Sequence, residues 1–208
     1  MTCIIGLSMS TCTDDSNKFV ENRIKRKQQY IDGLKKFFEY QPFFDDHNIK
    51  VYLTDNTTLN IDQDILDIVP INVILIPSIN NNYGCKNKGA GLIEQWIYNS
   101  KLISKHEWFI HFEPRQLLID NCFFQEFIKN PRNLFKYGSE KTDHYNTGLF
   151  SIKCTDLIAY CNKYKPEYLV KNNISIEYIM YQEYPNSEKI DKLGLIWHDS
   201  YANIDRYY

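Results

Sequence analysis

Three absences in this sequence narrow the class of protein that it can encode. No apolar run approaches the roughly 20 residues that a helix needs to cross a membrane, so we expect no transmembrane segment. No basic region precedes the short apolar run at the N-terminus, which argues against a signal peptide. Positive charge is not in excess, since 24 Lys and Arg face 26 Asp and Glu, and this balance argues against a dedicated nucleic-acid binder.

The cysteine pattern lacks the close pairs that a structural zinc site normally needs. None of the 6 cysteines belongs to a CxxC motif, and a chain of 208 residues can bury an adequate core without disulfides. We therefore expect reduced thiols, mostly buried, in a cytoplasmic compartment. The cysteines are Cys3, Cys12, Cys85, Cys122, Cys154 and Cys161.

Apolar runs alternate with helical patterns along the first half of the chain. This order predicts an α/β fold of the Rossmann-like kind, with a mostly parallel central sheet and helices on both faces. The run at 71–78 is apolar throughout, which is typical of a strand covered on both faces. The helical pattern at 19–40 has a strongly basic outer face. The predicted strands are 3–10, 49–56, 71–78 and 107–113, and the predicted helices are 19–40, 62–69 and 89–102.

The second half of the chain has a more variable pattern. It contains no internal repeat, low-complexity linker or clear boundary, so we expect one domain over residues 1–208, with a nucleotide-binding half at about 1–115 and a second half at about 116–208. The predicted elements of that half are helices at 122–130, 154–164 and 175–185, and strands at 133–139, 145–153 and 192–201.

Polar residues follow three of the predicted strands. Ligands of open α/β sheets bind beyond the carboxyl ends of the strands, so a nucleotide base and ribose could lie at the first two ends and a diphosphate at the third. Strand ends are polar in any α/β protein, but the three ends together favour a binding site. The residues are Thr11, Thr13, Asp14 and Asp15 after the first strand, Thr54, Asp55 and Asn56 at the second, and His111, Glu113 and Arg115 at the fourth.

The stretch "NKGAG" (87–91) is neither a P-loop nor a GxGxxG motif. Small residues at a helix entrance can allow close packing. Alternatively, the backbone at Gly89 could approach a phosphate, with Lys86 and Lys88 supplying positive charge. The sequence leaves both interpretations open.

The stretch "HFEPR" (111–115) is the most informative short motif. Strand residues alternate between faces, so His111 and Glu113 point the same way if the strand extends to Glu113. Pro114 ends the strand because it lacks a backbone donor. His111 and Glu113 could bind a divalent metal, and Arg115 could pair with phosphate oxygens. A surface pair between Glu113 and Arg115 is the alternative.

The succession of these motifs resembles glycosyltransferases of the GT-A fold. The matching features are an N-terminal strand, the loop and helix "NKGAGLIEQW", a strand that ends at "HFEPR" in place of the family's DxD motif, the Asn146–Gly148 turn, and a late histidine, His198. The resemblance implies a nucleotide-sugar donor, UDP-sugars among the candidates, and a glycan or other hydroxyl acceptor for the second half. It also implies Mn²⁺ or Mg²⁺ held by His111, Glu113 and His198, and Asn146 and Gly148 near the donor. Compact domains of large DNA viruses and some bacteria are also similar, and a viral protein would act in the host cytoplasm.

The chain departs from that family because DxD is absent. Glu113 takes the place of the first acid and Arg115 that of the second, so the metal site is either altered or missing. Without a metal, Arg115 and nearby lysines would neutralise the leaving diphosphate. An inverting enzyme needs a base for the acceptor hydroxyl, and the candidates are Asp143, Glu177 and Glu183. The aromatic candidates for stacking on sugars are Tyr83, Tyr145 and Tyr201.

Two other functions compete with sugar transfer. A sugar-nucleotidyltransferase would share the sheet, but a resemblance to that class implies a glycine-rich loop with basic residues after the first strand. The stretch "MSTCTDDSN" contains neither glycine nor a basic residue. A non-catalytic module that binds carbohydrate or nucleotide-sugar would explain the loss of DxD. Turnover of a nucleotide-sugar separates this module from an enzyme.

Overall fold

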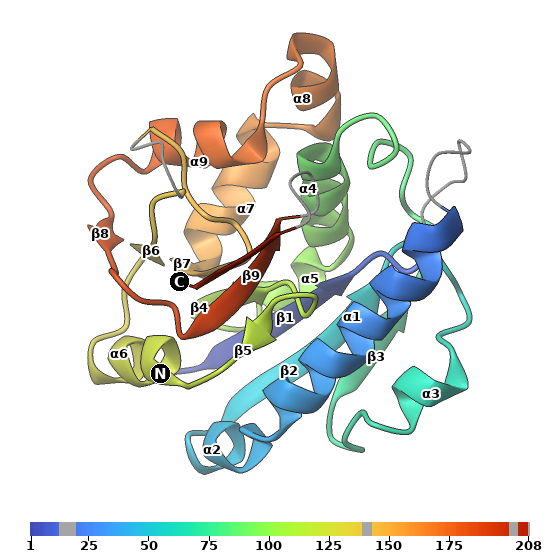
Figure 1. Cartoon of the computed structure of the whole chain (residues 1–208). Coiled ribbons are helices and arrows are strands. Elements are labelled where there is room, and N and C mark those ends of the chain that lie inside the picture. The colour runs from blue at the N-terminus through green and yellow to red at the C-terminus, as the bar shows by residue number, and fades with distance from the viewer. Residues whose placement is uncertain (13–19, 139–142, 200–203, 208) are drawn as a thin grey trace.

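The computed structural model describes residues 1–12, 20–138, 143–199 and 204–207 (Figure 1). The helices in these ranges are α1 (Val20–Phe38), α2 (Gln41–Asp46), α3 (Gln63–Leu66), α4 (Lys88–Tyr98), α5 (Ser100–Ile103), α6 (Cys122–Lys129), α7 (Cys154–Lys163), α8 (Pro166–Asn172) and α9 (Ile176–Glu183). The strands are β1 (Cys3–Met9), β2 (Ile49–Asp55), β3 (Ile74–Pro77), β4 (Trp108–Phe112), β5 (Leu117–Leu118), β6 (Leu134–Phe135), β7 (Leu149–Lys153), β8 (Glu188–Lys189), β9 (Leu195–Asp199) and β10 (Ile204–Tyr207).

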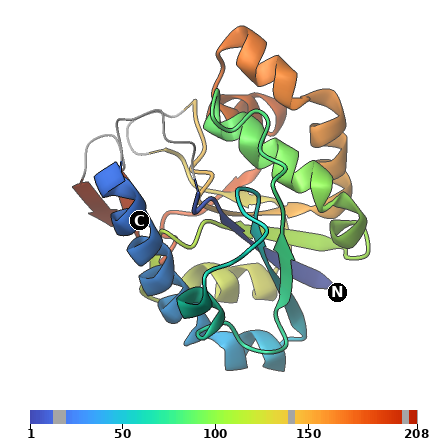
Figure 2. The ribbon, with the colours of Figure 1, turned by 90° about the vertical axis from the view of Figure 1, so that its right-hand side faces the viewer.

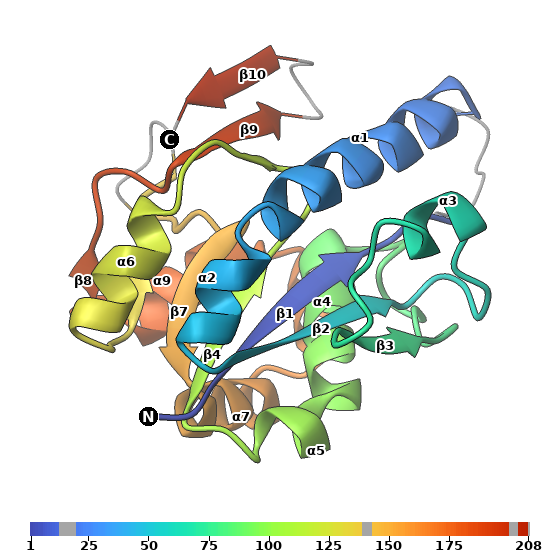
Figure 3. The ribbon, with the colours of Figure 1, turned by 90° about the horizontal axis from the view of Figure 1, so that it is seen from below.

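The predicted mostly parallel sheet is confirmed. Within the described ranges, seven strands form one sheet in the order β3-β2-β1-β4-β7-β6-β8. β1 lies between β2 and β4 and runs parallel to both, whereas β7 runs antiparallel to β4. A second sheet has the order β10-β9-β5 and lies outside the main one, next to α1 and α6 (Figure 3).

Helices cover both faces of the main sheet, as Figure 2 shows for α1 on one side and α4 and α7 on the other. Successive residues of a strand face opposite sides, so β4 sends Phe112 into one core and Phe109 into the other. Phe112 stacks on Phe37 of α1, with ring centroids 5.4 Å apart. Phe109 packs against Trp96 of α4. The buried apolar faces of α1 and α4 thus hold the sheet between two layers.

β3 corrects one prediction. The run at 71–78 indicated a strand covered on both faces, but β3 is an edge strand that pairs only with β2 among the described strands. Ile74 is 41% exposed and Leu75 is 43% exposed. A strand at the edge of a sheet has a neighbouring strand on one side only, so its side chains can be exposed even when they are apolar. The apolar composition of residues 71–78 therefore does not by itself show that the strand is buried.

Two helices, α2 and α8, and three strands, β5, β8 and β10, lie where the sequence predicted no element. α2 and α8 each carry a proline in the first turn, Pro42 and Pro166, where a missing backbone donor costs nothing. The C-terminal stretch contains β10, which pairs antiparallel with β9.

The six cysteines are free thiols, as predicted, but only Cys3, Cys154 and Cys161 are buried. Cys12 and Cys122 are half-buried and Cys85 is exposed, so the expectation that most are buried holds for half of them. Among the described helices, none combines the length and the apolar composition of a membrane span.

Candidate active site

The predicted strand ends lie next to one another, along the edge of the sheet that the carboxyl ends of β1, β2 and β4 form. The strand registers place Met9 beside Asp55 and Leu7 beside Phe112, and Phe112 lies opposite Leu149 of the antiparallel β7. The backbone amide of Glu113, just after β4, donates to the carbonyl of Gly148 at 2.8 Å. The "HFEPR" motif and the Asn146–Gly148 turn, 30 residues apart or more, therefore form one structure.

Asp55 joins the ends of β1 and β2. Its Oδ2 accepts from the Thr11 amide at 3.1 Å and from the Thr11 hydroxyl at 2.5 Å. Its Oδ1 accepts from the Thr57 amide at 2.8 Å and from the Thr57 hydroxyl at 2.6 Å. Thr11 and Asp55 were predicted to touch a nucleotide, but the Asp55 carboxylate is buried and engaged by the protein itself. In this structure the pair fixes the loop after β1.

Two arginines meet around one buried tyrosine at this edge. Arg115 donates from Nε and Nη2 to Glu113 Oε1 at 2.7 and 2.5 Å, and it also interacts with Tyr30. The Tyr30 hydroxyl accepts from the Ser10 amide at 2.9 Å and from Arg26 Nη2 at 3.3 Å. Arg26 Nε donates to the Ser10 carbonyl at 2.8 Å. Two guanidinium groups therefore lie at the ends of β1 and β4.

Arg26 was missed by the sequence reasoning, which counted it among the basic residues on the outer face of the helix. The signal was present, because Arg26 lies four residues before Tyr30 and therefore shares a helix face with it. Tyr30 and Leu34 belong to the apolar face that packs on the sheet. A basic residue in line with a buried apolar face points toward the protein.

The pKa values of Glu113 and Arg115 are both shifted from their ordinary values. Burial alone would raise the pKa of Glu113, but the charges of Arg115 and Arg26 outweigh it and lower that pKa to about 2. Burial likewise opposes the charged form of Arg115, yet the adjacent Glu113 raises its pKa. Glu113 is thus ionised and Arg115 protonated at neutral pH, so the pair is ionic.

The structure does not place His111 and Glu113 together on an exposed face, as the predicted strand up to Glu113 implied. β4 ends at Phe112, and the His111 ring is 1% exposed. It packs against the rings of Trp96 and Phe150, with centroids 5.5 and 5.3 Å away, and its Nδ1 lies 3.5 Å from Ser8 Oγ. Burial lowers the pKa of His111 to about 4, partly opposed by the charge of Glu113. His111 is therefore a neutral core residue.

The predicted metal set is not assembled by the residues that the structure describes. In that part of the chain, no group of three or more His, Cys, Asp or Glu side chains could hold a metal ion. Glu113 Oε1 is engaged by Arg115, and His111 is enclosed by aromatic rings. The backbone of His198 lies in β9 opposite Asp205, and its side chain is outside the described part. As placed, His111 and Glu113 do not form a metal site by themselves.

The "NKGAG" stretch has a packing role. Asn87 caps α4 by accepting from the Ala90 amide at 3.0 Å, and its side-chain amide donates to the Ile174 carbonyl at 3.1 Å. A Cβ added at Gly89 would lie 2.6 Å from Ile176 Cβ, so only glycine lets α4 approach the start of α9 this closely. Lys86 and Lys88 are exposed near this helix entrance.

Of the three predicted carboxylate bases, Asp143 and Glu177 lie near the start of β7, whereas Glu183 is engaged elsewhere by Lys163 and Tyr164. Glu177, in the first turn of α9, accepts from the Thr147 hydroxyl at 3.1 Å, and Thr147 belongs to the Asn146–Gly148 turn. Asp143 Oδ1 lies 2.7 Å from Nδ1 of His144, a residue that the sequence reasoning missed. An Asp–His pair two residues before a predicted donor turn is the signal that could have found it.

Several predicted residues lie elsewhere or are not described. Tyr145 is fully buried, stacked on Phe135 with centroids 4.5 Å apart, so it cannot present a face to a sugar. Tyr83 donates to Glu167 at 2.5 Å on the surface. Thr13, Asp14, Asp15 and Tyr201 fall outside the described residues.

Comparisons with known proteins find similarity in structure and none in sequence. No protein-family model matches the chain, and no curated protein matches its sequence. A Bacillus anthracis protein described as a glucose-1-phosphate thymidylyltransferase, in complex with sucrose, is similar in structure with a TM-score of 0.57. The two share 9% identity, over 96% of this chain and 89% of that one.

Two glycosyl-transferring proteins are also similar in structure. Core-mannan synthase A from Aspergillus fumigatus, in a form with Mn and GDP, gives a TM-score of 0.54 at 6% identity, over 88% of this chain and 69% of that one. The galactosyltransferase LgtC, with donor and acceptor sugar analogs, gives 0.51 at 10% identity, over 89% and 69%. With the observed strand order, these likenesses confirm the predicted GT-A-like fold.

Acid is expected to destabilise the protein through His111 and Glu113. His111 has a folded pKa of about 4 against an ordinary 6.5, so its contribution to stability is lost as pH falls from 6.5 toward 4. Glu113, at about 2 against 4.5, loses its contribution as pH falls from 4.5 toward 2. Each group changes the free energy of unfolding by at most about 1.4 kcal/mol per pH unit.

Urea unfolding between pH 7 and pH 4 measures the first of these losses. The variant His111→Leu keeps an apolar side chain at the site but does not titrate, so it should flatten the dependence. An identical pH dependence in parent and variant would contradict the burial of a neutral imidazole.

Proposed function

We propose that this chain is a glycosyltransferase that moves a hexosyl or related sugar from a nucleotide-diphosphate sugar to a glycan or other hydroxyl acceptor. The observation that carries the proposal is the pair Arg26 and Arg115, placed at the carboxyl ends of β1 and β4 and held by Tyr30 and Glu113. Guanidinium groups bind phosphate oxygens in a bidentate manner. Charge that develops on a leaving diphosphate would be stabilised by such fixed cations.

The other residues of this edge would have distinct roles. Glu113 holds Arg115 in position, and the Asn146–Gly148 turn lies beside it through the Glu113–Gly148 hydrogen bond. Lys88 and Gly89 open α4 next to α9 and would lie on the diphosphate side. In an inverting reaction a base must remove the proton of the acceptor hydroxyl, and Glu177 or the Asp143–His144 pair would do so.

Dependence on Mn²⁺ or Mg²⁺ remains a prediction. Glu113 and His198 are still its candidates, whereas His111 is the least suited of the three because its ring is enclosed. The proposal for Arg26 and Arg115 does not require a metal.

The sugar-nucleotidyltransferase remains the second candidate, and one of the similar structures is described as such an enzyme. The loop after β1 weighs against it here. In the described part of that loop, Thr11 and Cys12 are fixed through Asp55 and Thr57, and no glycine is present. Release of pyrophosphate from a nucleoside triphosphate and a sugar 1-phosphate would identify this activity, and binding without turnover would identify the non-catalytic module.

Thermal melting against UDP-, GDP-, ADP- and dTDP-sugars, each with and without Mn²⁺, tests the donor site. A ligand at 100 times its Kd adds about 2.7 kcal/mol, which for a chain of this size raises Tm by roughly 5–10 °C. We expect one nucleotide to produce the shift. A shift that appears only with Mn²⁺ would assign a metal to the site.

Arg26→Gln and Lys27→Gln form a matched pair for this measurement. Both remove one positive charge from α1, but Lys27 pairs on the surface with Asp62 and Asp64. We expect Arg26→Gln to abolish the shift and Lys27→Gln to keep it. Equal shifts in both variants, or no shift with any sugar nucleotide, would contradict the proposed donor site.

A further inference from the structure

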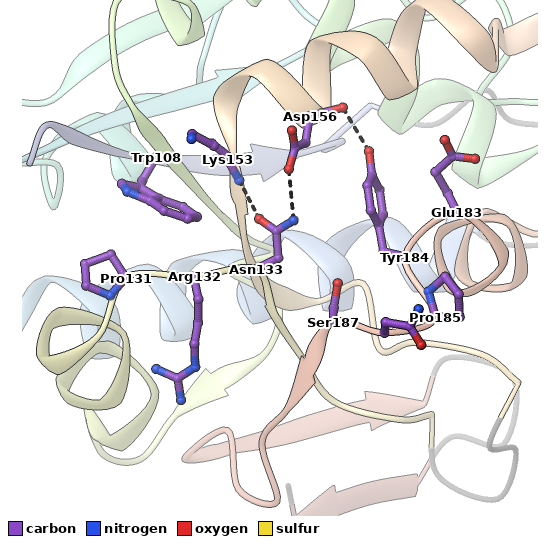
Figure 4. A pocket seen from close by; sticks show the side chains of 11 residues that line it. Trp108, Pro131, Arg132, Asn133, Lys153, Asp156, Glu183, Tyr184, Pro185 and Ser187 are labelled. Atoms are coloured by element: carbon purple, nitrogen blue, oxygen red, sulfur yellow. Dashed lines mark hydrogen bonds between the residues drawn. The ribbon is translucent and has the colours of Figure 1, made fainter.

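A second site lies at the opposite end of the sheet. A cavity of about 500 Å³ opens where β4 begins and β7 ends, at the paired residues Trp108 and Lys153 (Figure 4). The candidate active site lies at the other end of the same two strands, beyond Phe112 and Leu149. Four residues of extended strand separate the two ends by about 14 Å. The cavity is therefore distinct from the proposed donor site, and its volume is within the range of small-molecule pockets, about 300–1,000 Å³.

The side walls of the cavity are apolar. Figure 4 shows Trp108 and Pro131 on one side and Tyr184 and Pro185 on the other. Trp108 is partly exposed, and its ring is supported from behind by an edge contact with Phe127, with centroids 5.8 Å apart. Flat aromatic and proline surfaces offer favourable contact to the C–H faces of a ring-shaped ligand.

Between these walls lies a polar network whose geometry is already fixed. Asn133 Oδ1 accepts from the Lys153 amide at 2.8 Å, and Asn133 Nδ2 donates to Asp156 Oδ2 at 3.0 Å. The Tyr184 hydroxyl donates to the Asp156 carbonyl at 2.9 Å, as the dashed lines in Figure 4 mark. Carboxylate and amide oxygens each have further acceptor capacity, so Asp156 and Asn133 can receive hydroxyl donors. A network fixed in advance reduces the entropy lost on binding.

The charges around the cavity are largely neutralised within the protein. Arg132 forms ion pairs with Glu126 at 2.7 Å and Glu188 at 2.6 Å. Glu183 pairs with Lys163 at 2.5 Å. Lys153 and Asp156 add one charge of each sign to the lining. This balance favours neither a phosphate nor a cation, and it suits a neutral ligand that carries many hydroxyl groups.

We propose that this cavity binds a neutral carbohydrate. A sugar ring would pack on Trp108, and its hydroxyl groups would donate to Asp156 and Asn133. The inference does not depend on the proposed glycosyl transfer, because it concerns a different end of the sheet and different residues. On this basis the protein holds a glycan at a place where no transfer occurs.

Fluorine NMR of protein labelled with 5-fluorotryptophan tests the proposal directly. The sequence has 3 tryptophans, so three resonances are expected, and Trp108→Phe identifies the one from Trp108. The probes are maltotriose, cellotriose, mannotriose and triacetylchitotriose. We expect at least one trisaccharide to shift the Trp108 resonance in a saturable manner while the resonance of the buried Trp96 stays in place.

Substitutions then separate stacking from a general effect. Trp108→Leu should weaken binding about tenfold, as expected for loss of an aromatic contact, and Trp108→Phe should restore part of it. Tyr98→Leu is the control, since Tyr98 is an exposed aromatic residue on α4 that does not line the cavity. If Trp108→Leu fails to fold, Asn133→Asp provides the second variant, because it keeps the acceptor for the Lys153 amide and loses the donor to Asp156.

Three outcomes would overturn the proposal. They are the absence of a Trp108 shift with every trisaccharide, equal loss of binding in Tyr98→Leu, and tighter binding of a glucuronate-containing oligosaccharide than of its neutral analogue. The melting shift with nucleotide-sugars should persist in Trp108→Phe, which keeps failure of this site distinguishable from failure of the donor site.

Discussion

Arg115→Gln is expected to abolish binding of the nucleotide-sugar and to lower the free energy of unfolding by about 3 kcal/mol. The side chain of Arg115 is 9% exposed and that of Glu113 is 27% exposed. Their ion pair is therefore largely shielded from water. Removing the cation leaves a carboxylate in a site where burial disfavours its charge, and the charge of Arg26 compensates for this in part. Chemical denaturation measures the stability, and thermal melting with the donor measures binding.

Glu113→Gln distinguishes the two consequences of that substitution. Glutamine retains an oxygen that can accept from Arg115, so the guanidinium group keeps one partner and much of its position. We expect a smaller loss of stability than in Arg115→Gln, together with a clear fall in transfer. The double variant gives the coupling energy between the two residues. Normal transfer by Arg115→Gln would remove Arg115 from the proposed mechanism.

Gly33→Ala is expected to destabilise the protein by about 3 kcal/mol, the reverse of the usual effect of this change in a helix. Alanine normally stabilises a helix interior by about 1 kcal/mol relative to glycine. Gly33, however, lies in the middle of α1 against the "HFEPR" segment, and an added Cβ would fall 1.6 Å from the Pro114 carbonyl oxygen. The helix or the segment after β4 must move.

Lys35→Ala is the matched control, because Lys35 is exposed on the same helix and its loss should change stability by less than about 0.5 kcal/mol. Denaturant unfolding of both variants gives the comparison. Since the displaced segment carries Arg115, the donor-induced shift of Tm should also fall in Gly33→Ala. A more stable Gly33→Ala protein would show that α1 does not approach Pro114 as described.

The strands of the fold were predictable where apolar runs had clear ends. The predicted strand 3–10 became β1 (Cys3–Met9), and 107–113 became β4, which ends at Phe112 because Pro114 cannot extend the ladder. The exposure of β3 was not predictable, because an apolar run does not reveal whether a strand is central or at an edge. β10 was not predictable either, since its partner β9 is what makes that polar stretch a strand.

The candidate site was predictable in outline and not in its contacts. Sequence alone indicated that the ends of β1, β2 and β4 would converge, since parallel strands end at the same edge. It did not indicate that Asp55 would be engaged by Thr11 and Thr57, or that His111 would be enclosed by Trp96 and Phe150. The contacts of Asp55 with Thr11 and of His111 with Trp96 and Phe150 join residues that are far apart in the chain, and periodicity carries no information on them.

The contact of Gly33 with Pro114 and the Glu113–Gly148 hydrogen bond share one property: the groups that meet on the "HFEPR" side are main-chain atoms. Such contacts depend on the path of the backbone, and apart from a glycine they place few demands on which side chains are present. During evolution this edge could exchange its acids, bases and metal ligands while its shape persisted. The presence of Glu113 and Arg115, where the resemblance to GT-A enzymes leads one to expect DxD, is what such drift would produce.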